Sequence, residues 1–218
     1  MTQAPREIDA AARLLRSARF LVSAADVAQL PADDLPEVAF VGRSNAGKSS
    51  ALNCLCDQRA LARVSRTPGR TQLLNLFVLG PEPVGRLVDL PGYGYARVPA
   101  AERSRWDKRV GGYVIGRPNL RGLVLLADVR RLLTPLDEAL LEHACGHGRP
   151  VHILLTKADK LSRGGGAAAL ARLLKHASRY PVPPTAQLFS VPLRLGVGAA
   201  RRQVCRWLWP DGAETLDG

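Results

Sequence analysis

Residues 42–49, with the sequence GRSNAGKS, have the types and spacing of a phosphate-binding loop. They match the pattern G-x-x-x-x-G-K-[ST], in which backbone N–H groups of a glycine-rich turn point at phosphate oxygens. An apolar strand at residues 38–41 precedes this run and a helix is expected to follow it, as the pattern requires. We expect Lys48 to reach the terminal phosphates of a nucleotide and Ser49 to ligate Mg²⁺. The predicted phosphate-contacting residues are Gly42, Arg43, Ser44, Asn45, Ala46, Gly47, Lys48 and Ser49.

A second apolar run ends in a D-x-x-G sequence, formed by Asp89, Leu90, Pro91 and Gly92. Asp89 can hold Mg²⁺ through a water molecule, and the Gly92 N–H can approach a γ-phosphate because glycine has no side chain. Read alone, the four residues could form an ordinary turn. Their position after the phosphate loop favours a γ-phosphate sensor.

A third run, Thr156, Lys157, Ala158 and Asp159, follows another apolar strand. A carboxylate here can accept two hydrogen bonds from the N1–H and N2–H₂ edge of guanine, which adenine does not offer. Lys157 would lie along the base, and Thr156 would tie this loop to the phosphate loop. The alternative is that Asp159 only caps a helix.

The segment between the first two motifs is positioned as a loop that closes over the γ-phosphate. A threonine in it should complete the coordination of Mg²⁺, and Thr71 is preferred over Thr67 because it immediately precedes the next strand. The alternative is an inert basic connection. The segment runs from Arg63 to Phe77.

Strands and helices alternate along the chain, which predicts an α/β fold with three layers. The strands expected after residue 41 are 73–79, 86–90, 122–128, 151–156 and 186–190, and the first two of these form an antiparallel hairpin. The expected helices are 48–56, 100–114, 136–146, 167–180 and 198–209, and residues 164–166, all glycine, are expected to be a flexible loop. The sheet is therefore six-stranded and mainly parallel with one antiparallel strand, helices cover both faces, and ligands bind at the carboxyl ends of its strands.

The chain carries 31 Lys and Arg against 19 Asp and Glu, a formal net charge of +12. Such an excess favours a polyanionic partner, of which RNA is the obvious candidate, although an Arg-rich composition could also be solvated surface. No apolar run is long enough to span a bilayer. The four cysteines fit neither a disulfide framework nor a zinc site, so we expect a cytoplasmic protein without a membrane partner.

The segments GRSNAGKSS, TPGRTQ, DLPGYGYA and TKADKL together resemble the EngB (YihA/YsxC) family of ribosome-biogenesis GTP-binding proteins, within the Era-like GTPases. The resemblance covers most of the chain. It implies an N-terminal extension at residues 1–20, a P-loop GTPase domain (G domain) at 21–209 and a C-terminal tail at 210–218. It also implies GTP and GDP as ligands and Mg²⁺ held by Ser49 and Thr71. The nucleotide-contacting residues that it implies are Gly69, Arg70, Thr71, Gln72 and Leu73 in the closing loop, and Phe189, Ser190 and Val191 in a last base-contacting loop.

The resemblance further implies a monomer that acts in assembly of the large ribosomal subunit, contacts its RNA and proteins, and is needed for normal septation. Two departures from the family pattern are visible. The family usually has Ser-Ser at residues 190–191, and residues 131–133 replace a segment that often contains proline. The departure at residues 190–191 weakens only a contact of the side chains with the base, because backbone N–H groups of this loop can still contact guanine.

Tyr93 stands where many GTPases have a water-orienting glutamine, which predicts slow hydrolysis. Asn45 matches an asparagine that helps hold K⁺ in related GTPases, so K⁺ or a ribosomal partner could supply the missing positive charge, although Asn45 could instead bond only within its loop. Lys48, Thr71 and Asn45 are thus the predicted catalytic residues. Two other readings are a P-loop ATPase or kinase, and a nucleotide-binding scaffold without productive turnover. The basic residues near the nucleotide-sensing segments are Arg59, Arg63, Arg66, Arg70, Arg97, Arg103, Arg105, Lys108 and Arg109.

Overall fold

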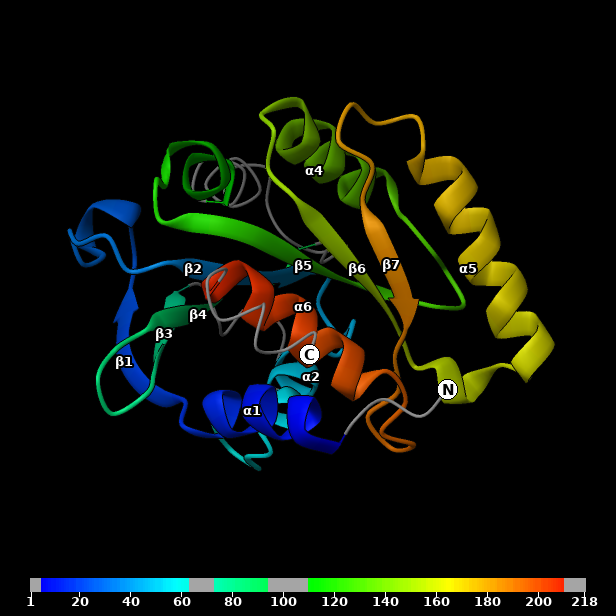
Figure 1. Ribbon diagram of the computed structural model, residues 1–218. Coiled ribbons are helices and arrows are strands. Elements are labelled where there is room, and N and C mark those ends of the chain that lie inside the picture. The colour runs from blue at the N-terminus through cyan, green and yellow to red at the C-terminus, as the bar shows by residue number, and fades with distance from the viewer. Residues whose placement is uncertain (1–4, 63–72, 94–109, 210–218) are drawn as a thin grey trace.

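Strand β2 (Glu37–Gly42) is buried along its whole length, as expected for a central strand covered on both faces. Its side chains alternate between two hydrophobic cores, with Val38 and Phe40 in one and Ala39 and Val41 in the other. The computed structural model describes residues 5–62, 73–93 and 110–209, and for residues 5–9 it describes the backbone alone. The phosphate loop follows directly from β2 and is therefore anchored in the middle of the molecule (Figure 1).

The sheet has seven strands in the order β1-β3-β4-β2-β5-β6-β7. Strand β3 runs antiparallel to β1 and β4, while β4, β2, β5, β6 and β7 pair in parallel. The predicted fold class is confirmed, with one strand more than expected. The other strands are β1 (Arg19–Ala24), β3 (Leu74–Leu79), β4 (Gly85–Asp89), β5 (Leu120–Asp128), β6 (Val151–Thr156) and β7 (Thr185–Leu188).

Helices cover both faces of the sheet, as predicted (Figure 1). One core is formed with α1 (Pro5–Arg16), α2 (Lys48–Leu55) and α6 (Val197–Leu208). The other core is formed with a helical segment at 110–116, α4 (Pro135–Gly146) and α5 (Arg163–Ala177). Of the helix predicted at 100–114, the part before residue 110 lies outside the described residues.

Two expectations for the chain's irregular parts are wrong. Residues 164–166 are not a flexible loop, because they form the first turn of α5, where the Ser162 side chain accepts a hydrogen bond from the Gly165 N–H. This N-cap compensates for the low helix propensity of glycine. The same helix ends at Ala177, before the predicted residue 180. Tyr180 is instead buried after the helix end.

The N-terminal part of the chain is packed onto the body of the fold. Helix α1 contacts α6 and α2, and its residues Ala11 and Leu15 are buried in the same core as those helices. The predicted boundary after residue 20 falls within β1, and residues 210–218 lie outside the described part. Among the described helices, none combines the length and apolarity needed to cross a membrane.

A buried ionic cluster lies at the end of the sheet opposite the phosphate loop. Glu37, at the start of β2, accepts hydrogen bonds from Arg86, Arg117 and the Tyr113 hydroxyl. Its carboxylate is completely buried, so these donors supply the pairing that a buried charge requires. Tyr113 lies in the helical segment at 110–116, and Arg117 directly follows it. The cluster therefore fixes this helix to the centre of the sheet.

Candidate nucleotide-binding site

The phosphate loop has the backbone geometry that its glycines were predicted to allow. Gly42 has φ 157°, and a Cβ at this position would lie 2.6 Å from the Leu126 carbonyl oxygen. Gly47 has φ 94°, in the left-handed region, and a Cβ there would meet no atom within 4 Å. Any side chain at either position is therefore strained, and the space above Gly47 remains open to a phosphate group.

The start of α2 fits an anionic ligand. Its N-cap, Gly47, makes no side-chain hydrogen bond, so the first N–H groups of the helix are available to phosphate oxygens. Lys48 forms an ion pair with Asp89, which is largely buried at the end of β4. The Ser49 hydroxyl and the Asp89 carboxylate are hard oxygen donors, which fit Mg²⁺ together with water and phosphate oxygens.

The D-x-x-G residues lie directly against the phosphate loop. The Leu90 N–H donates to Phe40 O at 3.0 Å, and the Ser44 N–H donates to Tyr93 O at 2.9 Å. A Cβ on Gly92 would lie 3.0 Å from Ser44 Oγ and 3.3 Å from Ser44 N, closer than ordinary contact. Glycine is therefore needed at this position for the two loops to approach each other.

Strand β6 carries the predicted base-recognition loop to the same end of the sheet. As predicted, Thr156 ties this loop to the phosphate loop, because its hydroxyl donates to Ala46 O at 2.7 Å. Lys157 has φ 59°, in the left-handed region, and its ammonium donates to Asn45 O at 2.8 Å. The side chains of Thr156 and Lys157 thus both connect the base-recognition loop to the backbone of the phosphate loop.

The Asp159 carboxylate is oriented by the loop that follows β7. The Ser190 hydroxyl donates to Asp159 Oδ1 at 2.7 Å, and Lys160 lies 3.3 Å from Oδ2. The hydrogen bond from Ser190 lowers the pKa of Asp159, so the carboxylate is ionised and able to accept hydrogen bonds. Asp159 is not a helix cap, since Ser162 caps α5 and Lys157 caps the short 3₁₀ turn η2 (Ala158–Lys160).

Comparisons with known proteins agree with this arrangement. A family model described as MMR_HSR1, 50S ribosome-binding GTPase, matches residues 37–157. A protein named "Probable GTP-binding protein EngB" from Paraburkholderia phymatum is 47% identical, with 94% of this chain and 96% of the relative covered. The chain belongs to the EngB family of GTP-binding proteins. Another relative of the same name, from Cupriavidus taiwanensis, is 48% identical over 89% of this chain and 86% of its own.

Solved structures show the same fold at lower sequence identity. A crystal structure of a probable GTP-binding protein EngB has a TM-score of 0.64 and 18% identity, covering 79% of this EngB chain and 98% of the other. An NFeoB mutant from S. thermophilus bound to GDP has a TM-score of 0.54 and 21% identity, covering 79% of this chain and 61% of the other. These likenesses concern the fold alone.

In this EngB chain, the Tyr93 side chain is bonded to the start of α4. Its buried hydroxyl donates to Asp137 on α4, and burial raises the pKa of Tyr93, which keeps the phenol protonated. The other carboxylate oxygen of Asp137 accepts from the N–H and the hydroxyl of Thr134, both at 2.7 Å. Tyr93 therefore fixes the end of the D-x-x-G loop to the start of α4.

Part of the predicted site lies outside the described residues, namely residues 69–72 with Thr71, the alternative Thr67, and all the listed basic residues except Arg59. Leu73, which is described, is exposed. The other predicted residues are brought together at the carboxyl ends of β2, β4, β6 and β7. Sequence reasoning missed Asp128 and Asp137, although Asp128 ends a predicted strand, where ligand-binding residues gather.

Proposed function

We propose that this chain binds GTP and GDP together with Mg²⁺ and hydrolyses GTP slowly. The observation that carries the proposal is the orientation of the ionised Asp159 by Ser190, on a loop tied to the phosphate loop through Thr156. A carboxylate held in this way matches the two donors of guanine and no pair of donors on adenine. This favours a GTPase over a P-loop ATPase or kinase.

Lys48 exchanges partners in this proposal. Lys48 forms an ion pair with Asp89 in the structure, and with GTP bound it would turn to the β- and γ-phosphates, so that Asp89 could help to hold Mg²⁺ through water. Ser49 and Thr71 would hold Mg²⁺, which would neutralise charge on the phosphates. Gly92 contributes its backbone N–H near the γ-phosphate. Since the Tyr93 hydroxyl bonds to Asp137, no side chain at residue 93 orients the attacking water, which makes intrinsic turnover slow.

Fluorescent GDP binding to wild type and to Asp159→Asn, with Mg²⁺ present, tests guanine recognition. We expect GTP but not ATP to compete in the wild type, and xanthosine nucleotide to compete only in the variant. Asp34→Asn removes the same charge from an exposed residue before β2 and should behave as wild type. Equal competition by ATP would contradict the GTPase assignment.

We also propose that the protein acts in the cytoplasm in assembly of the large ribosomal subunit, and that its effect on septation follows from too few ribosomes. The description of the matching family model and the net charge of +12 support this proposal. Co-sedimentation with large subunits, in GTP analogue or GDP and at rising salt, is the test. Binding that responds to neither nucleotide nor salt would contradict a GTP-gated contact with ribosomal RNA.

K⁺ is a proposed activator, held in part by Asn45. The side chain of this residue is exposed and makes no hydrogen bond with the residues that the structure describes, so it can accept a ligand. Phosphate release is expected to be faster in K⁺ than in Na⁺ and faster still with ribosomal subunits. Equal rates in both salts would remove K⁺ from the proposal, and no release under any condition would favour a scaffold role.

A further inference from the structure

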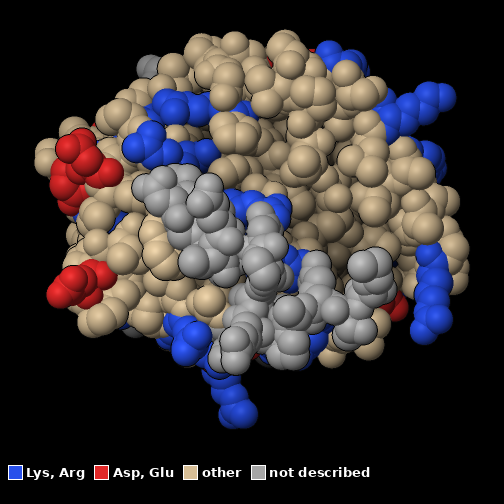
Figure 2. Space-filling model, in the orientation of Figure 1, with Lys and Arg blue, Asp and Glu red and all other residues tan. Residues whose placement is uncertain are grey.

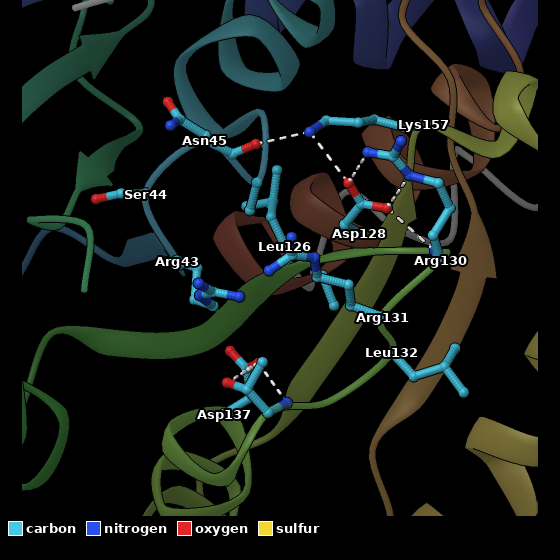
Figure 3. Close-up of a pocket in the computed structure, with 13 residues that line it drawn as sticks. Arg43, Ser44, Asn45, Leu126, Asp128, Arg130, Arg131, Leu132, Asp137 and Lys157 are labelled. Atoms are coloured by element: carbon cyan, nitrogen blue, oxygen red, sulfur yellow. Dashed lines mark hydrogen bonds and ion pairs between the residues drawn. The ribbon is translucent and has the colours of Figure 1, made fainter. Parts of the chain in front are cut away.

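A cavity of about 240 Å³ lies beside the phosphate loop, next to the predicted nucleotide site (Figure 3). One wall is residues 43–46 of the loop, and the other walls come from the end of β5, the connection to α4, and Asp137. The cavity shares Lys157 with the base-recognition loop. Lys48, Ser49 and Asp159 do not line it, so the cavity lies beside the predicted nucleotide site and shares residues 43–46 of the phosphate loop with that site.

The lining of this cavity has an excess of positive charge. Its four cationic side chains are Arg43, Arg130, Arg131 and Lys157, and its two acidic side chains are Asp128 and Asp137. The face of the molecule seen in Figure 2 also displays more Lys and Arg than Asp and Glu side chains. The local excess therefore follows the charge balance of the chain, which favours anions.

Both acidic groups of the lining are already engaged. Asp128 Oδ2 lies 2.7 Å from Arg130 Nη2 and 3.1 Å from Lys157 Nζ. Hydrogen bonds from Arg130 are the main reason why the pKa of Asp128 is well below its ordinary value. Asp137 accepts from Thr134 and Tyr93. Arg130 and Lys157 therefore share the single negative charge of Asp128, whereas Arg43 and Arg131 form no ion pair with the residues that the structure describes.

Arg43 and Arg131 reach the cavity from two different elements. Figure 3 shows both side chains extending into it, Arg43 from the phosphate loop and Arg131 from the connection after β5. Neither guanidinium has a hydrogen bond or ion pair with another residue drawn there. Arg43 is half-buried and Arg131 is exposed, so an anion can enter from solvent and meet donors on two sides.

We propose that this cavity binds a backbone phosphate of RNA, with Arg43 and Arg131 as its two donors. The inference deepens the proposed function, on which it rests, by naming where ribosomal RNA is held. RNA is favoured over a single acidic side chain because the whole chain carries a net charge of +12, which attracts a polyanion from a distance. A partner's arginine finger is disfavoured in this cavity, because two guanidinium groups already extend into it.

This position would couple RNA to the nucleotide. The backbone of Arg43 forms a β-bridge with Tyr93, and the next N–H, that of Ser44, donates to Tyr93 O at 2.9 Å. A phosphate on the Arg43 side chain would therefore bind a residue whose backbone joins the phosphate loop to the residue after the D-x-x-G sequence. If RNA changes the affinity for GTP, GTP must change the affinity for RNA by the same factor.

The test compares Arg131→Gln with Arg121→Gln in the full chain. Each variant loses one positive charge. Arg121 is exposed near the start of β5, whereas Arg131 lies just beyond the end of this strand. Binding of a short fluorescein-labelled RNA hairpin is measured at several KCl concentrations. We expect R131Q to bind roughly 3- to 10-fold more weakly, and the slope of log affinity against log salt to fall by about 0.7–0.9, the value of one phosphate contact. R121Q should change both quantities less, and R131Q should keep wild-type GDP affinity.

Several outcomes would overturn the inference. Equal weakening by both variants would mean that only net charge matters. Weaker binding of R131Q to large subunits, with unchanged binding to the RNA hairpin, would identify an acidic protein group as the occupant. If inorganic phosphate binds to the wild type but not to R131Q, while both proteins bind the RNA hairpin equally well, the cavity holds a small anion and not RNA. If R131Q loses RNA binding but wild type does not bind large subunits, the ribosomal proposal fails and the RNA site stands.

Discussion

At the scale of single residues, Tyr93 shows how a side chain next to a γ-phosphate sensor can serve the architecture. Its position suggests a residue that acts on water, but its hydroxyl is buried and donates to Asp137. Asp137 in turn receives two hydrogen bonds from Thr134 at the start of α4. The phenol therefore joins the end of the D-x-x-G loop to the start of α4.

Replacing Tyr93 by Phe tests this role. The variant leaves one oxygen of a buried carboxylate without its donor, so the free energy of unfolding should fall by about 1–3 kcal/mol. Single-turnover GTP hydrolysis should change by less than about twofold, because the hydroxyl is already bonded to Asp137. Thermal unfolding and phosphate release measure the two quantities. A large loss of hydrolysis with unchanged stability would show that the hydroxyl acts on the attacking water.

Roles could be predicted for individual residues where a short contiguous pattern carried the information. Lys48, Asp89 and Asp159 could be identified because each lies at a fixed place in a local motif. The role of the Ser190 hydroxyl could not, because Ser190 and Asp159 are 31 residues apart and meet only through the pairing of β6 with β7. The resemblance placed Ser190 in a base-contacting loop but did not indicate that its hydroxyl bonds to Asp159.

At the scale of elements, Asp57 connects the helix after the phosphate loop to the base-contacting loop. It follows α2 with φ 49°, in the left-handed region, and accepts from Arg194 at 2.7 Å. Arg16 from α1 and Arg201 from α6 bind the same carboxylate at 2.8 and 2.7 Å. Since Arg194 lies a few residues after Ser190, this ion pair restrains the loop that orients Asp159.

Arg194→Gln should therefore weaken nucleotide binding without unfolding the protein. We expect GDP to dissociate about 2- to 5-fold faster, an effect limited by the exposure of the Arg194 side chain. Arg16→Gln is the matched control, because it removes another exposed partner of Asp57 that does not reach the loop. Stopped-flow displacement of fluorescent GDP gives both rates. Equal acceleration in the two variants would mean that Asp57 acts only on overall stability.

The strength of the hydrophobic pattern determined which elements could be predicted. The buried strands β2, β5 and β6 and the helix α4 lie close to their expected positions, because apolar runs and caps mark them clearly. Strand β1 is an edge strand whose first three residues are exposed, so it carries little of the burial signal. The start of α5 was mistaken for a loop because glycine is a poor helix former, whereas the Ser162 cap and packing against Leu188 outweigh that preference.

At the scale of the whole molecule, arginines neutralise several of the acidic groups that the structure describes. The hydrogen bond from Arg86 is the main reason why the pKa of Asp33 is lowered. Partial burial raises the pKa of Asp57, but the hydrogen bonds from Arg194, Arg16 and Arg201 outweigh it and hold this pKa well below its ordinary value. Folding thus uses arginine to keep carboxylates ionised, and the remaining cations are available to a polyanion.

This arrangement makes the stability of the molecule depend on acidity, with Asp57 as a measurable contributor. Because its pKa is lower in the folded than in the unfolded chain, its stabilisation is present above the unfolded value of about 3.9 and is lost as the pH falls below it. Asp57→Asn should reduce the free energy of unfolding by about 2 kcal/mol at neutral pH. Urea unfolding from pH 7 down to about pH 2 should show the gap between variant and wild type narrowing below about pH 4, as the wild type loses this contribution. Asp34→Asn, an exposed control, should follow the wild-type curve; a gap for Asp57→Asn that stays constant with pH would show that the loss comes from packing rather than from the charge.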